Sequence, residues 1–228
     1  MYWFSLDNER CDRYGIIVDK RTAEAAPEMK YSKASSNYLD GAFFTNYGTY
    51  EIIEKRFECN FVEENPEKWH EHWRYIKRWL LREHDIIRYS DDIGIFRKVL
   101  HTSISESERQ IEETGNFTVT FTLQPYEYYD KGLIKHTVKD CEYNIYSTSH
   151  PIYIVSGDKP TLTVNGNTFK VFKNGTSYID TDLMICYDDQ KNFVQSSGFF
   201  EDIYLQEGMN DISVDIGSLL IIPNWRSI

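Results

Sequence analysis

Hydrophobic and polar residues alternate along several stretches of the chain, as they do in strands that bury one face. From residue 53 to residue 61 the odd positions hold Ile, Lys, Phe, Cys and Phe, and the even positions are polar or charged. Phe117, Val119, Phe121 and Leu123 repeat this pattern before Pro125, which lacks the N–H needed to continue a central strand. Residues 2–6, 14–18, 85–90 and 93–104 also predict strands. Residues 19–48, rich in Ala, Ser and Asn, predict a loop.

One stretch, "KWHEHWRYIKRWLLREHD" (residues 68–85), has helical periodicity. Trp69, Trp73, Ile76 and Leu80 recur at spacings of four, three and four, which places them on one face of an amphipathic helix. Asn65 is a favourable N-cap, and a proline follows at the first helical position. We therefore predict a helix from residue 66 to about residue 83.

Beyond about residue 135 the helical periodicity disappears, and short alternating runs are separated by turn residues. The clearest is "TLTVNGNTFKVF", which predicts a hairpin around Asn165-Gly166. Further turns are expected at Asn174-Gly175, Asp188-Asp189 and Glu207-Gly208. This pattern is typical of a β-sandwich or jelly roll. We expect a mainly β protein, with an α+β N-terminal domain (1–133) that contains one main helix and a C-terminal sandwich (134–228).

Composition narrows the class of protein. The net charge of −11 disfavours tight binding to a phosphate backbone, and 15% aromatic residues favour sheets and protein interfaces. The four cysteines are widely separated, as expected for reduced thiols in a cytosolic product. The sequence predicts neither a signal peptide nor a membrane span.

The sequence offers no convincing catalytic set. His70 and His72 lie 200° apart on a helix, so they cannot form the i, i+4 pair of a helical zinc site. The acidic pairs Asp91-Asp92, Asp180-Thr-Asp182 and Asp188-Asp189 could bind calcium or act as glycosidase carboxylates, but such pairs usually form turns. No nucleophile elbow, phosphate loop or dinucleotide fingerprint occurs. We predict no enzyme activity and no catalytic, cofactor-binding or metal-binding residues.

Basic side chains on the outer face of the predicted helix suggest a protein interface. Arg74, Arg78 and Arg82 could pair with acidic groups of this chain or of a neighbouring subunit, and nucleic-acid binding is the less favoured alternative. The polar segment 105–114 is a second candidate contact. The predicted interface residues are Arg74, Arg78, Arg82, Glu106, Glu108 and Arg109.

The order of these elements resembles the distal tail (Dit) protein family of long non-contractile phage tails. A Trp-rich helix ending "RWLL" is followed by a "YSDD" turn and by "GNFTVTFTLQPYEYY". Near the end, "GFFEDIYLQEGMNDISV" and "IIPNWRSI" are similar to further motifs of that family. The matching residues are Gly115, Phe117, Val119, Phe121, Pro125, Tyr126, Gly198, Phe200, Leu205, Gly208, Asn210, Ile212, Pro223, Trp225 and Arg226. Glu201 and Ile228 depart from the pattern, where the family often has Pro and Leu.

The resemblance implies a hexameric ring at the distal end of the tail, formed by the N-terminal domain, with a galectin-like sandwich projecting outward. Its implied partners are the tail tube protein, a tail-associated lysin or tail fibre protein and, in some members, a receptor-binding protein. DNA would pass through the ring without specific binding, and an acidic lumen would ease its passage. The implied location is the virion tail tip, after assembly in the host cytoplasm. The alternative function is a carbohydrate-binding module for cell-wall saccharides, and a hydrolase is a weaker third hypothesis.

Overall fold

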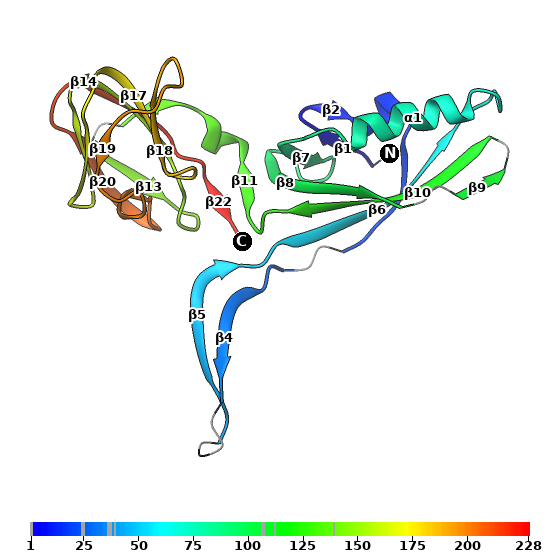
Figure 1. The fold of residues 1–228 in the computed structure, drawn as a ribbon, viewed down its shortest axis with the longest axis horizontal. Coiled ribbons are helices and arrows are strands. Elements are labelled where there is room, and N and C mark those ends of the chain that lie inside the picture. Colours follow the sequence, from blue (N-terminus) through cyan, green and yellow to red (C-terminus); the bar gives the residue numbers. More distant parts are fainter. Residues whose placement is uncertain are drawn as a thin grey trace. The chain divides into compact units, whose positions relative to one another are not determined.

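The computed structural model describes residues 2–23, 26–35, 38, 40–105, 108–111, 113–138 and 140–228 (Figure 1). The chain divides into two compact units, residues 1–126 with Ile228 and residues 127–227. The protein is mainly β, with several antiparallel sheets and, among the described residues, one α-helix, as the sequence predicts. No helix in these residues is long and apolar enough to cross a membrane.

The first unit is built on a long antiparallel sheet with the strand order β2-β1-β7-β8-β10-β6-β3, and β9 pairs with β10. These strands are β1 (Phe4–Leu6), β2 (Glu9–Arg10), β3 (Ile17–Arg21), β6 (Ile53–Val62), β7 (Ile86–Tyr89), β8 (Ile95–Ile104), β9 (Glu108–Ile111) and β10 (Thr114–Leu123). The predicted alternation in β6 and β10 is confirmed, because every second residue of each strand is buried.

The predicted amphipathic helix is confirmed as α1, although it is shorter than expected and spans Trp69–Leu80. The Asn65 side chain does not cap it. Instead, Asn65 Oδ1 accepts a hydrogen bond from the backbone N–H of Glu67 at 3.0 Å, which stabilises a separate turn. Regular helical bonding therefore begins only after this turn, and Lys68 occupies the N-cap position without a side-chain hydrogen bond.

The N-terminal segment differs from its prediction at two places. A 3-10 helix (Cys11–Tyr14) occupies the start of the strand expected at residues 14–18, and β3 begins at Ile17. The loop expected at residues 19–48 contains a hairpin, β4 (Met29–Ala34) and β5 (Phe43–Tyr50), which forms a two-stranded sheet of its own (Figure 1). Both faces of this hairpin are exposed, so it has no alternation of buried and exposed residues from which to predict it.

The second unit is a sandwich of two five-stranded sheets with the orders β12-β21-β14-β17-β18 and β13-β20-β15-β16-β19. Tyr153 and Ile221 of the first sheet and Phe169 and Ile212 of the second belong to one buried core. The strands of these sheets are β12 (His136–Thr137), β13 (Cys141–Asn144), β14 (Ile152–Asp158), β15 (Thr161–Val164), β16 (Asn167–Val171), β17 (Asn174–Asp180), β18 (Ile185–Asp188), β19 (Ser196–Ser197), β20 (Gly208–Val214) and β21 (Ser218–Ile222). Outside them, β11 (Glu127–Tyr129) pairs with β22 (Arg226–Ser227). Two 3-10 helices, Asp130–Leu133 and Glu201–Ile203, complete this unit.

The predicted turns of the sandwich are confirmed in part. Asn165 and Gly166 both have positive φ, 50° and 85°, and connect β15 to β16 as predicted. Asn174-Gly175 is a correction: the two residues begin β17 and pair with Asp158 and Gly157 instead of forming a turn. A glycine with a positive φ, here 97°, can be accommodated at a strand end, so the dipeptide alone did not decide between turn and strand.

Candidate protein interface on helix α1

Helix α1 is held against the sheet by an aromatic face. Trp73 packs against Phe61 of β6 and Phe117 of β10, with ring-centroid distances of 5.7 and 4.9 Å. The sequence pattern missed Trp79, which is also buried and stacks on Tyr14 at 4.2 Å. This packing fixes which face of the helix points outward, and Arg74, Tyr75 and Arg78 are exposed there.

Arg82, one of the predicted interface residues, already has a partner in its own chain. Glu9 Oε2 accepts hydrogen bonds from Tyr14 Oη at 2.8 Å, Trp79 Nε1 at 3.0 Å and Arg82 Nη2 at 2.5 Å. The Tyr14 hydroxyl and then the Arg82 guanidinium hold the pKa of Glu9 below its usual value, although partial burial opposes them. This cluster ties the end of the helix to the N-terminal segment.

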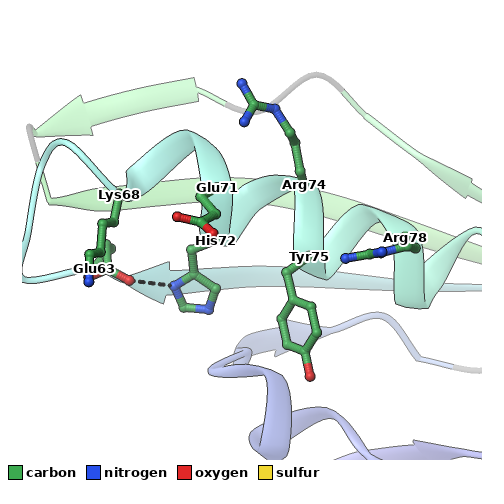
Figure 2. Close-up of a pocket in the computed structure, with 7 residues that line it drawn as sticks. All are labelled: Glu63, Lys68, Glu71, His72, Arg74, Tyr75 and Arg78. Carbon is green, nitrogen blue, oxygen red and sulfur yellow. Dashed lines mark hydrogen bonds and ion pairs between the residues drawn. The ribbon is translucent and has the colours of Figure 1, made fainter.

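Arg74 and Arg78 differ from Arg82, because neither forms an ion pair within the part of the chain that the structure describes. They border an open hollow of about 460 Å³, shown in Figure 2. In this view Arg74 leaves the helix on the side opposite His72 and Tyr75. The hollow is lined by Glu63, Lys68, Glu71, His72, Arg74, Tyr75 and Arg78.

The two histidines at the start of the helix have different environments. His70 is exposed. His72 is partly buried, and its ring lies between Glu63 Oε2 at 3.1 Å from Nδ1 and the carbonyl of Tyr14 at 3.0 Å from Nε2. His72 therefore connects the helix to the residue that follows β6 and to the N-terminal segment.

His84, a buried histidine that the sequence pattern did not single out, connects the end of the helix to the turn between β1 and β2. His84 Nε2 lies 2.7 Å from the carbonyl of Trp79, and His84 Nδ1 lies 2.8 Å from Asp7 Oδ2. Burial by itself would raise the pKa of Asp7. Its hydrogen bonds with His84 and with the backbone N–H groups of Ile86 and Asp85 outweigh this and lower the pKa.

The remaining predicted interface residues lie in the polar segment 105–114. Glu108 and Arg109 belong to β9, whose backbone pairs with Asn116 and Gly115 of β10. Glu106 lies outside the described residues. The structure thus brings Arg74 and Arg78 together at one hollow, while Arg82 is engaged by Glu9.

The described residues contain no group of three or more His, Cys, Asp or Glu side chains that could hold a metal ion. Cys59 and Cys186, expected in the core, are buried, as is Cys11, while Cys141 is exposed. The acidic residues expected to form turns do so: Asp180 Oδ1 accepts hydrogen bonds from the N–H groups of Asp182 and Leu183 at 3.1 and 3.0 Å.

The architecture is that of a two-part, mainly β protein with a helix-bearing sheet and a β-sandwich. The Dit protein (gp 19.1) of phage SPP1 has this fold, with a TM-score of 0.68 over 100% of this chain and 98% of that chain, at 12% identity. That protein is described as a paradigm of hub adsorption apparatus in Gram-positive infecting phages. No protein-family model and no curated protein matches the sequence.

The residues that carry the sequence resemblance occupy positions with strict structural demands. A Cβ atom on Gly115 would lie 2.3 Å from the Phe61 ring and 2.8 Å from Trp69. Gly198 has a φ of 133°, and a Cβ atom there would lie 2.8 Å from the carbonyl oxygen of Thr168. Arg226 is buried and donates to the carbonyl of Thr148 at 2.8 Å. The fold therefore accounts for these three residues of the motifs.

Proposed function

We propose that this protein is a structural distal tail protein of a long-tailed phage and has no enzyme activity. The observation that carries the proposal is the likeness to the SPP1 Dit hub protein, which extends over nearly the whole of both chains. The ordered motifs from Gly115 to Arg226 support it independently of the structural comparison. Its location would be the virion tail tip, reached after assembly in the host cytoplasm.

The β4–β5 hairpin supports self-assembly of the first domain into a ring. A two-stranded hairpin alone is marginally stable in water, and both of its edges offer unpaired backbone groups. Tyr31, Phe43, Phe44 and Tyr47 on this hairpin are 58 to 63% exposed. Contact with a second copy of the chain would cover these aromatic rings and stabilise the strands.

We therefore assign residues 1–133 to a hexameric ring and residues 134–228 to a projecting galectin-like sandwich, a proposed boundary that lies seven residues after the one between the two compact units. Arg74 and Arg78, which lack ion pairs in the described residues, are proposed as ring or partner contacts together with Arg82, Glu106, Glu108 and Arg109. The ring would join the tail tube protein to a tail-associated lysin or tail fibre protein, and possible receptor-binding proteins would attach to it. DNA would pass through the ring without sequence-specific contacts, which suits a net charge of −11.

Self-assembly is tested by native mass spectrometry of the full chain, alone and mixed with a tail tube protein from the same phage. We expect a species of six times 27.0 kDa. Replacing Phe44 and Tyr47 together by Ser should shift the population toward monomers. Phe199→Ser, which changes a residue exposed to a similar degree in the second unit, is the control and should assemble normally.

The location is tested by immunogold labelling of phage particles that contain this chain, with antibodies against the purified protein. Label at the distal end of the tail is expected. Label confined to the capsid, or a chain that remains monomeric under both conditions above, would contradict the proposal.

A further inference from the structure

One edge of the β-sandwich carries a row of aromatic side chains on its outer surface. Tyr178 of β17 and Tyr187 of β18 are directly paired, and their rings are parallel within 2° at a centroid distance of 5.2 Å. Phe193 pairs in turn with Tyr187 through an isolated antiparallel bridge. Directly paired residues point to the same face of a sheet, so the three rings share one face. Phe193, at the end of the row, is 81% exposed.

The loop that carries Phe193 is held in a fixed conformation by Asp188. Asp188 Oδ1 accepts hydrogen bonds from the backbone N–H groups of Gln190 and Asn192, both at 2.9 Å, and Asp188 Oδ2 pairs with Lys173. The Lys173 ammonium and then the Asn192 N–H lower the pKa of Asp188. The loop is thus ordered by its own side chains before any ligand binds.

This ordered loop presents polar groups beside the aromatic row. Asp189 Oδ1 accepts a hydrogen bond from the Tyr178 hydroxyl at 3.0 Å. The Lys191 ammonium lies 4.2 Å from the centroid of the Tyr187 ring and covers that face. Asp189 also lines an open hollow of about 260 Å³, together with Lys173, Asn174, Gly175, Thr176, Asp188 and Gln190.

We propose that this edge of the sandwich binds a neutral oligosaccharide. One sugar ring would occupy the hollow, where Asp189, Asn174 and Gln190 offer carboxylate and amide groups to its hydroxyls. A further ring of the same oligosaccharide would place its C–H face on Phe193, which is 81% exposed. The proposal concerns the second unit alone and does not depend on assembly of the ring.

The chemistry of the site favours this ligand over others. The two carboxylates, Asp188 and Asp189, are balanced by Lys173 and Lys191, so the site offers no net charge to attract a phosphate polymer. The hollow lies just below the roughly 300 Å³ at which drug-sized pockets begin, which suits a single sugar ring. Neutral polar groups beside an exposed ring match the alternation of hydroxyls and C–H groups on a sugar.

The test begins with the full chain on an array of neutral oligosaccharides built from glucose, galactose and N-acetylglucosamine. A glycerol phosphate polymer is included as the charged probe. The strongest neutral binder is then titrated by calorimetry. Phe193→Ala is expected to weaken its binding by about tenfold or more, and Asp189→Ala should do the same. Because both side chains are exposed, these variants should retain the fold, which circular dichroism checks.

Tyr143→Ala serves as the matched control, because Tyr143 is a 62% exposed aromatic residue on the other sheet of the same sandwich. Binding should be unchanged in this variant. Absence of binding to every neutral saccharide, binding of the phosphate polymer alone, or equal loss in the Tyr143 and Phe193 variants would each overturn the proposal.

Discussion

Replacement of Asn210 by Ala should destabilise the β-sandwich strongly, because this side chain is fully buried and forms five hydrogen bonds. Its Oδ1 accepts from Gln206 N–H and from Asn165 Nδ2, both at 2.9 Å. Its Nδ2 donates to the carbonyls of Gln206, Gly208 and Glu142 at 2.8, 3.1 and 3.4 Å. Asn210 thus joins the backbone of residues 206–208 to that of Glu142 and to the side chain of Asn165.

The magnitude follows from these contacts. Each hydrogen bond contributes about 0.5–1.5 kcal/mol net, and a buried group left without a partner costs about 1–3 kcal/mol. Four of the five bonds are 3.1 Å or shorter, so we expect a loss of about 3 kcal/mol. A loss of this size raises the hydrogen-exchange rate by roughly 100-fold for backbone amides that exchange only when the whole unit unfolds.

Hydrogen exchange followed by mass spectrometry is the suitable assay, because it resolves β14 and β17 of the second unit within the full chain. Tryptophan fluorescence would be dominated by the other unit, which contains Trp3, Trp69, Trp73 and Trp79. Asn167→Ala is the control, since Asn167 is exposed and its side chain makes one hydrogen bond, to the carbonyl of Asp202. Equal, small rate changes in the Asn210 and Asn167 variants would refute the reasoning.

Asn210→Asp adds a dependence on pH. A carboxylate at this position would be buried and would face the three carbonyl oxygens that now accept from Nδ2, so the folded-state pKa of the new carboxyl should exceed its unfolded value of about 3.9. The destabilisation relative to wild type should therefore be smallest near pH 4 and grow as the pH rises through the folded pKa. A difference that stays constant between pH 4 and 8 would contradict this.

Three further predictions concern other parts of the chain. In the native protein one thiol, Cys141, should react with Ellman's reagent at pH 8. The other three thiols, Cys11, Cys59 and Cys186, are buried, which shields them from the reagent and raises their pKa values. Fast reaction of two or more thiols would be inconsistent with the fold. The pKa of Asp7 is lowered in the folded state, so its stabilising effect is present above about pH 4 and is lost as the pH falls further. Asp7→Asn should therefore reduce the loss of stability of the first unit in acid, measured by Trp fluorescence. Gly115→Ala should destabilise that unit by about 1–3 kcal/mol, because the new methyl group would overlap the Phe61 ring. If the variant unfolded at the same denaturant concentration as the wild type, that close contact would be disproved.

The sequence by itself determined the elements whose signal is local and periodic. β6 and β10 each bury every second residue, and the Trp69–Leu80 stripe faces the sheet, so their patterns could be recognised without knowing the fold. The Asn165-Gly166 hairpin was predictable for the same reason, since its backbone requires positive φ at both residues. The helix start was misplaced because Asn65 caps a turn instead of the helix.

Only the tertiary structure decided which distant side chains meet. Glu9 lies 70 residues from Trp79, yet it accepts hydrogen bonds from both Trp79 and Arg82, so Arg82 has a partner within its own chain that the sequence did not indicate. The β4–β5 hairpin has no buried face, so no periodicity marked it. The aromatic row ending at Phe193 depends on strand pairing between β17, β18 and the following loop. Strand pairing brings together residues that have no recognisable spacing in the sequence. These surfaces therefore could not be predicted from the sequence.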